Sequence, residues 1–228
     1  MPPPEDTYLV VVAGAMNPAI HHPSWYEIAG ILSNEEATRA SQSGVVVVSP
    51  QVASFNVGQI SITCIPARWQ VQALSESDFP KIAEIAERTF KVLYHTPVSA
   101  FGINFMHHRL VRLENVAAEL GRAVRSLNLG FIHDATKLEA GKLIYETNAG
   151  DKFVTVRLEP SVSGPNQVYV AIHIERRFQP ADPTKFVQFD LKPEEWAAED
   201  LDDAKEQLAS VLKSIERLGS QGATHNGV

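Results

Sequence analysis

The chain has 228 residues, of which 44% are hydrophobic and 21% charged, and its formal net charge is −7 at pH 7. This length and composition allow a core that needs no metal or disulfide, whereas the acidic balance disfavours broad nucleic-acid binding, which requires a surplus of Lys and Arg. No apolar run approaches the ~20 residues of a membrane span, and the acidic, proline-rich start lacks the basic region of a signal peptide. We therefore expect a cytoplasmic protein with no membrane partner.

The first elements in chain order are a strand and two short helices. Residues 8–13 form an apolar run that predicts a buried strand. Ser24 and Ser33 are each followed three residues later by a glutamate, which is the spacing of a capping box. We expect one helix from 24 to 32 and a second beginning at Ser33, with a bend between them.

Strands and a stronger helix follow. The β-branched run 45–48 predicts a strand. Alternating apolar and polar residues at 60–64 and 69–73 predict two runs that form either a hairpin around Pro66 or one bent strand. Apolar residues with helical spacing predict a helix over 79–94, with one buried stripe.

The second part of the chain repeats this order of elements. It predicts strands at 100–105, 138–146, 153–159 and 168–175, an edge strand at 186–190, and helices at 113–124 and 200–218. Gly219 follows the last helix as a C-cap residue would.

The repeated order predicts an α+β fold, in which an antiparallel sheet with packed helices is built from two pseudo-repeated β-α-β(n)-α halves. The halves are residues 8–97 and 98–219, flanked by disordered segments at 1–7 and 220–228. One irregular α+β domain is the alternative. In architecture only, the plan resembles the tandem repeats of TATA-box-binding-like folds and the ligand-binding helix-grip folds. Neither resemblance implies a function, and the acidic chain departs from the DNA-binding case.

The sequence contains no catalytic signature. Cys64 lies in a strand-like run and is expected to be a buried free thiol. The pairs His21-His22 and His107-His108 have no carboxylate at ligand spacing, and neither a nucleophile elbow nor a phosphate loop is present. We therefore expect no metal, no cofactor and no catalytic residues. A metal- or His-dependent hydrolase using these four histidines or His173 is the alternative.

Candidate binding residues come from two features. An aromatic pair starts the first helix, where an exposed Trp would be an interface hot spot, and a basic cluster surrounds the predicted helix 113–124. The candidates are Trp25, Tyr26, His107, His108, Arg109, Arg112, Arg122 and Arg125.

These observations favour a non-catalytic protein-interaction or scaffold module of a soluble cytoplasmic assembly. A protein partner requires the fewest additional features of the fold, because sheet edges and amphipathic helices can themselves serve as docking surfaces. Self-association as a homodimer is the simplest case. Binding of a nucleic acid or a small ligand on the sheet is the remaining alternative.

Overall fold

The computed structural model describes residues 6–111, 116–118, 120, 136–139, 142–149, 152–162, 164–178 and 193–223, with backbone alone at 136–139, 142–149, 193–194 and 218–223. Within these residues the protein is α+β, and every strand pairing whose register is defined is antiparallel. The fold class predicted from the sequence is therefore confirmed. The chain forms two compact units, 7–104 with 175–200, and 105–174 with 1–6 and 201–228.

The unit of residues 7–104 and 175–200 contains a meander of strands and the helices that cover it. Its strand order is β2 (Val47–Val48), β3 (Ala53–Val57), β4 (Ile60–Ile65), β5 (Arg68–Ala73), β1 (Thr7–Gly14) and the first part of β6 (Val98–Leu110). Its complete helices are η1 (Pro18–Ile20), α1 (Pro23–Ile28), α2 (Asn34–Gln42), η2 (Glu76–Asp78) and α3 (Phe79–Val92).

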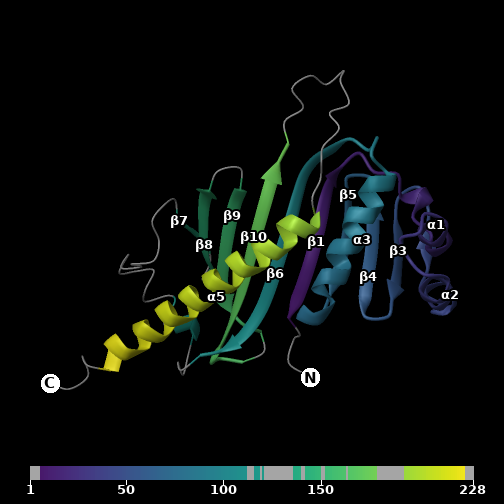
Figure 1. Cartoon of the computed structure of the whole chain (residues 1–228). Coiled ribbons are helices and arrows are strands. Elements are labelled where there is room, and N and C mark those ends of the chain that lie inside the picture. The colour runs from purple at the N-terminus through teal and green to yellow at the C-terminus, as the bar shows by residue number, and fades with distance from the viewer. Residues whose placement is uncertain are drawn as a thin grey trace. The chain divides into compact units, whose positions relative to one another are not determined.

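The core of this unit follows from the predicted alternation. Val10 and Val12 of β1 are fully buried, whereas the residues between them are partly exposed. Helix α3 packs on β1 and β5 through its apolar stripe, in which Ile82 and Ile85 are fully buried (Figure 1). The two runs around Pro66 form a hairpin, because Cys64 lies opposite Trp69 in an antiparallel ladder.

The unit of residues 105–174, 1–6 and 201–228 has the strand order β6, β10 (Gln167–Arg177), β9 (Lys152–Pro160), β8 (Lys142–Ala149) and β7 (Thr136–Glu139). Strands β9 and β10 alternate buried and partly exposed residues, as their sequence predicts. Helix α5 (Pro193–Ala223) contributes its residues from 201 onwards to this unit.

Both sequence halves have the same strand connectivity. In residues 8–97 the order is β2-β3-β4-β5-β1, and in residues 98–219 it is β7-β8-β9-β10-β6, so each first strand pairs with the last strand of its meander. The compact units do not coincide with these halves, because their boundaries fall within the long strands β6 and β10. The duplication itself remains a prediction, and the shared connectivity supports it.

Gly14 allows a close approach of two backbone segments. A Cβ at this position would lie 2.1 Å from the carbonyl oxygen of Pro97. The amide of the next residue, Ala15, donates a hydrogen bond to that oxygen at 2.9 Å. Only glycine fits between the end of β1 and the chain entering β6.

The structure corrects two predicted strands and adds a third. The run 45–48 forms a ladder only at Val47–Val48, and the prediction missed β3, although the residues of Ala53–Val57 alternate between apolar and polar. The single strand expected at 138–146 is two strands, with Glu139 opposite Lys142.

Helix ends also differ from the prediction. The side chain of His22, and not that of Ser24, caps α1, because Pro23 is favoured at the first helical position. Ser33 does form the predicted capping box with Glu36. Helix α5 begins at Pro193 and continues past Gly219 to Ala223, since glycine in a helix costs only about 1 kcal/mol relative to alanine.

The limits of the two predicted disordered segments change as well. Thr7 belongs to β1, and residues 220–223 belong to α5. Residues 1–5 and 224–228 lie outside the described residues, as do the predicted strand 186–190 and most of the helix predicted at 113–124.

Candidate interaction edge at strand β2

The feature that most clearly distinguishes the surface is a run of four valines at the edge of the sheet. Val45, Val47 and Val48 are 57%, 48% and 37% exposed, and Val46 is half-buried. Strand β2 pairs with β3 on one side, and no strand in the described part of the chain pairs with its other side. Exposed apolar edge strands are uncommon because they offer unpaired backbone groups to other chains.

Local hydrogen bonds fix both ends of this run. Upstream, the Ser43 hydroxyl donates to the carbonyl oxygen of Ala40 at the end of α2, and Gly44 takes the left-handed φ of 72° that turns the chain. Downstream, the Ser49 hydroxyl accepts hydrogen bonds from the amides of Gln51 and Val52 at 3.2 and 3.1 Å. The valines are thus held between a helix cap and a tight turn.

A hollow of about 530 Å³ adjoins the valine run. Its lining comes from α2, from the segment after α2, and from the end of β3. The lining residues are Glu36, Arg39, Ser43, Val45, Asn56, Val57 and Gly58. It lies between α2, Val45 and the end of β3, where the chain has not yet joined the ladder with β3.

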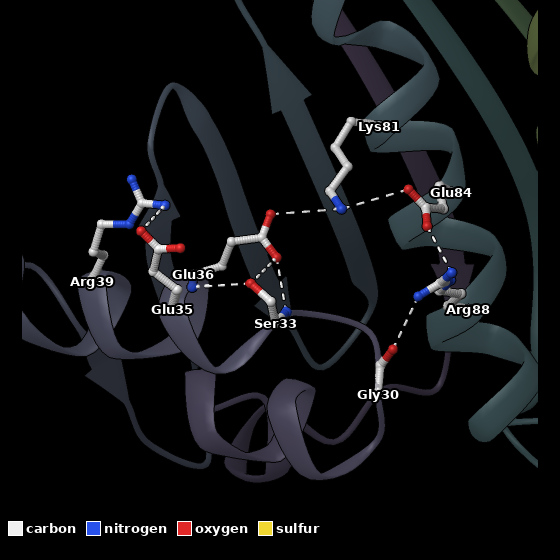
Figure 2. A network of polar contacts seen from close by, with 8 residues as sticks. All are labelled: Gly30, Ser33, Glu35, Glu36, Arg39, Lys81, Glu84 and Arg88. Atoms are coloured by element: carbon white, nitrogen blue, oxygen red, sulfur yellow. Dashed lines mark hydrogen bonds and ion pairs between the residues drawn. The ribbon is translucent and has the colours of Figure 1, made fainter.

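A network of ion pairs fixes α2, which supplies the charged rim of this hollow (Figure 2). Lys81 of α3 lies between Glu36 of α2 and Glu84, with N···O distances of 3.6 and 3.5 Å. Arg88 contacts Glu84 at 2.9 Å and donates to the carbonyl oxygen of Gly30 at 3.0 Å. The short helix is therefore attached to the longest helix of its unit.

Glu36 carries a negative charge at this rim. Burial acts to raise the pKa of its carboxyl, but hydrogen bonds from the Ser33 amide and hydroxyl and the Lys81 ammonium outweigh burial and lower it. Arg39 supplies the opposite charge and pairs with Glu35 at 3.2 Å. The rim thus presents both signs beside an apolar edge.

The aromatic pair predicted as a binding site lies largely in the core. Tyr26 has no exposed surface, and Trp25, which is half-buried, packs edge-on against it with ring centroids 4.9 Å apart. Tyr26 and His21 are therefore not available to a partner in the folded protein. A role for Trp25 in binding remains a prediction.

The second predicted site brings three neighbours on β6 into contact with other segments. Arg109 donates two hydrogen bonds to the carboxylate of Asp6, at 2.6 and 2.7 Å, and His107 lies 3.2 Å from the same carboxylate. Burial acts to raise the pKa of Asp6, but these contacts outweigh it and lower the pKa. His107 is only 6% exposed, so the cluster holds the residue that precedes β1.

His108 points to the opposite face of β6. Its Nδ1 lies 2.9 Å from the Ser161 hydroxyl, which is the separation of a nucleophile and its general base. Ser161 is buried, so the contact fixes the end of β9 and leaves little room for a substrate carbonyl. The ring of His108 also packs on Tyr169 of β10, and burial lowers the pKa of the imidazole.

The remaining candidates are dispersed or outside the described residues. Arg112, Arg122 and Arg125 fall outside them. Within the described part of the chain no three His, Cys, Asp or Glu side chains gather as metal ligands. Cys64 is a buried free thiol, as predicted, and burial raises its pKa to about 12.

Sequence reasoning predicted a strand at 45–48 but not an interaction site. Four consecutive valines have no alternation, and such a run is typical of a strand buried on both faces. The only available indication was the neighbourhood, because Ser43-Gly44 and Ser49-Pro50 bracket the run with residues typical of a surface turn.

No protein-family model and no curated protein matches the chain. Among solved structures it is similar to the di-domain ARO/CYC StfQ from the steffimycin biosynthetic pathway, with 10% sequence identity and a TM-score of 0.28 over 96% of this chain and 99% of that one. A likeness at this level carries no functional conclusion. None of the helices in the described part of the chain combines the length and apolarity that a membrane span needs.

Proposed function

We propose that this chain is a protein-interaction module that docks a partner strand on the edge formed by Val45–Val48. The exposure of this all-valine edge is the observation that carries the proposal. In strand addition, main-chain hydrogen bonds supply affinity, and side-chain pockets next to the edge supply specificity. The edge at β2 offers the unpaired backbone groups, and the hollow of mixed charge lies beside its first valine, Val45.

The chemistry of the edge favours an apolar protein segment over a nucleic acid. No charged residue occurs between Ser43 and Pro50, and the net charge of the chain is −7. A nucleic-acid backbone needs Lys and Arg, whereas an extended peptide needs unpaired backbone groups and apolar contacts.

The test compares two variants of the tagged protein in its native cell. Val47→Lys places a charge on the edge, which blocks strand addition. Val92→Lys makes the same substitution at a similarly exposed valine on α3 and serves as the control. Both proteins are purified with nuclease treatment, and the mass of each complex is measured by light scattering.

We expect the wild type and Val92→Lys to elute in a nuclease-resistant assembly, and Val47→Lys to elute as the bare chain with an unchanged circular dichroism spectrum. A wild type that remains a bare monomer after its purified fraction is concentrated to about 100 µM would refute the interaction module. An assembly that survives Val47→Lys would show that the edge of β2 does not hold that assembly together.

A further inference from the structure

The edge of β2 has the composition expected of a strand that pairs with itself. A two-fold axis places a strand antiparallel to its own copy, so that residue i of one chain faces residue j of the other and the reverse. Because Val45–Val48 are all valines, registers confined to this run place valine opposite valine. Cross-strand pairs of β-branched residues stabilise an antiparallel ladder.

Charge adds to this self-complementarity. Like charges directly opposite each other destabilise a ladder, and none would arise here because the segment 43–50 contains no charged residue. Edge strands that avoid self-pairing commonly carry a lysine or an inward-pointing charge, and this one has neither.

We propose that the occupant of this edge is a second copy of the chain, with β2 paired antiparallel to β2 of its partner. This inference rests on the proposed function and names its partner. A ladder of about four residues buries less than the roughly 1,200 Å² of a standard stable interface. We therefore expect a reversible dimer with a dissociation constant on the order of 1–100 µM.

Disulfide trapping tests the geometry directly. The only cysteine, Cys64, is buried, so one introduced cysteine is the sole accessible thiol. Single variants Val45→Cys, Val46→Cys, Val47→Cys and Val48→Cys are oxidised with copper phenanthroline, with Val92→Cys as the equally exposed control. Antiparallel pairing across a two-fold axis predicts that one position links to its own copy fastest and that the yield falls along the strand in both directions.

Sedimentation equilibrium of the purified wild type measures the association without cross-linking. We expect twice the mass of one chain at high concentration, a monomer on dilution, and a monomer at every concentration for Val47→Lys. A wild type that stays monomeric at 100 µM, or cysteines at 45–48 that link no faster than the control at 92, would overturn the second-copy inference.

The two proposals fail separately. A monomeric purified protein whose native-cell complex still depends on Val47 would exclude the second copy and leave the interaction module, with a different chain as its partner. In the opposite case, Val47→Lys leaves the native-cell complex intact but dissociates the purified dimer. This result would support the second-copy inference and exclude the edge of β2 as the site for other proteins.

Discussion

The indole Nε1–H of Trp69 donates a hydrogen bond to the hydroxyl of Tyr26 at 2.8 Å, which ties helix α1 to strand β5 across 43 residues of sequence. The same hydroxyl lies 2.8 Å from Nδ1 of His21. With the Tyr26 O–H directed at His21, Nδ1 accepts that hydrogen bond and the imidazole is neutral, with its proton on Nε2. The helices that lead to the β2 edge are therefore fixed by a buried polar chain.

Replacing Tyr26 by Phe should destabilise the protein by about 1–3 kcal/mol, because it leaves the buried indole N–H of Trp69 without an acceptor and Nδ1 of His21 without a donor. The substitution keeps the aromatic ring, so its contact with the ring of Phe55, with centroids 5.3 Å apart, persists. Urea denaturation measures the change in the free energy of unfolding. A variant as stable as the wild type would show that the hydroxyl contributes no net free energy.

Stability should fall as the pH drops from 6.5 towards 4. Burial lowers the pKa of His21 from 6.5 to about 4, so in this window the unfolded chain binds a proton that the folded chain excludes. The free energy of unfolding therefore decreases with falling pH, by up to on the order of 3 kcal/mol at 1.36 kcal/mol per pKa unit. Below the folded pKa this contribution no longer changes with pH.

The variant His21→Gln isolates this effect from other groups, including His108, whose pKa burial also lowers. We expect unfolding free energies measured between pH 4 and 7 to depend less on pH in the variant than in the wild type. Equal slopes in both proteins would show that burial does not lower the pKa of His21.

Asp200 of α5 and Arg176 of β10 form a buried ion pair. Removing one partner alone should destabilise the protein. Their side chains are 0% and 2% exposed, with N···O distances of 2.5 and 2.9 Å, and the guanidinium also lies 5.0 Å from the ring centre of Trp196. Asp200→Leu removes the closer carboxylate of a buried cation and leaves only the exposed Glu199 at 3.8 Å, which should cost up to about 3–5 kcal/mol.

The double variant Arg176→Met/Asp200→Leu removes both charges and should be much closer to the wild type in stability. Chemical denaturation of the single and double variants checks this. A double variant that is less stable than Asp200→Leu would show that the pair stabilises the fold beyond its desolvation cost.

The parts of the fold that could be predicted are those in which apolar residues repeat at regular spacing and one side of the element faces a core along its length. The stripe of α3 and the alternation of β9 and β10 each face a core on one side, so period and burial agree. The capping box at Ser33 could be predicted from the sequence because both of its hydrogen bonds join residues three positions apart.

The predictions failed where the environment depends on distant residues. The valines of β2 have the composition of a buried strand, but their exposure depends on the position of β2 at the end of the strand order, which local pattern does not encode. Tyr26 was predicted as a binding residue, but it is buried in the folded protein. Its partners in the core, Trp69 and His21, come from other elements, so the sequence around Tyr26 does not indicate this burial. The candidate site was therefore missed, although its strand was partly predicted.

The predicted apolar stripe of α5 is tested by charge placed on one side of the helix. Val211 is buried in its unit, so Val211→Asp should unfold the protein or make it insoluble, because an unpaired charge would be buried. Ser210→Asp introduces the same charge at an adjacent exposed position and should leave stability within about 0.5 kcal/mol. A soluble, folded Val211→Asp protein would contradict the packing of this helix.

Removing the hydroxyl of Thr89 should stabilise the protein. Thr89 lies on α3 with no exposed surface, and its Oγ1 makes no hydrogen bond of good geometry among the described residues, although the Tyr26 hydroxyl interacts with it. A buried hydroxyl without a partner carries a desolvation penalty of about 1–3 kcal/mol, and Val has nearly the same shape and helix propensity as Thr. Thr89→Val should therefore raise the free energy of unfolding by about 1 kcal/mol.

The matched control is Thr89→Ser, which keeps the hydroxyl and deletes the methyl group. We expect it to lose about 1 kcal/mol, because a cavity replaces a buried methyl while the unpaired hydroxyl stays. Thermal and urea unfolding of the wild type and both variants give the order Val, Thr, Ser in decreasing stability. If Thr89→Val is instead the less stable protein, the hydroxyl forms a hydrogen bond in solution, and the Tyr26 hydroxyl, which interacts with Thr89, is its nearest candidate partner.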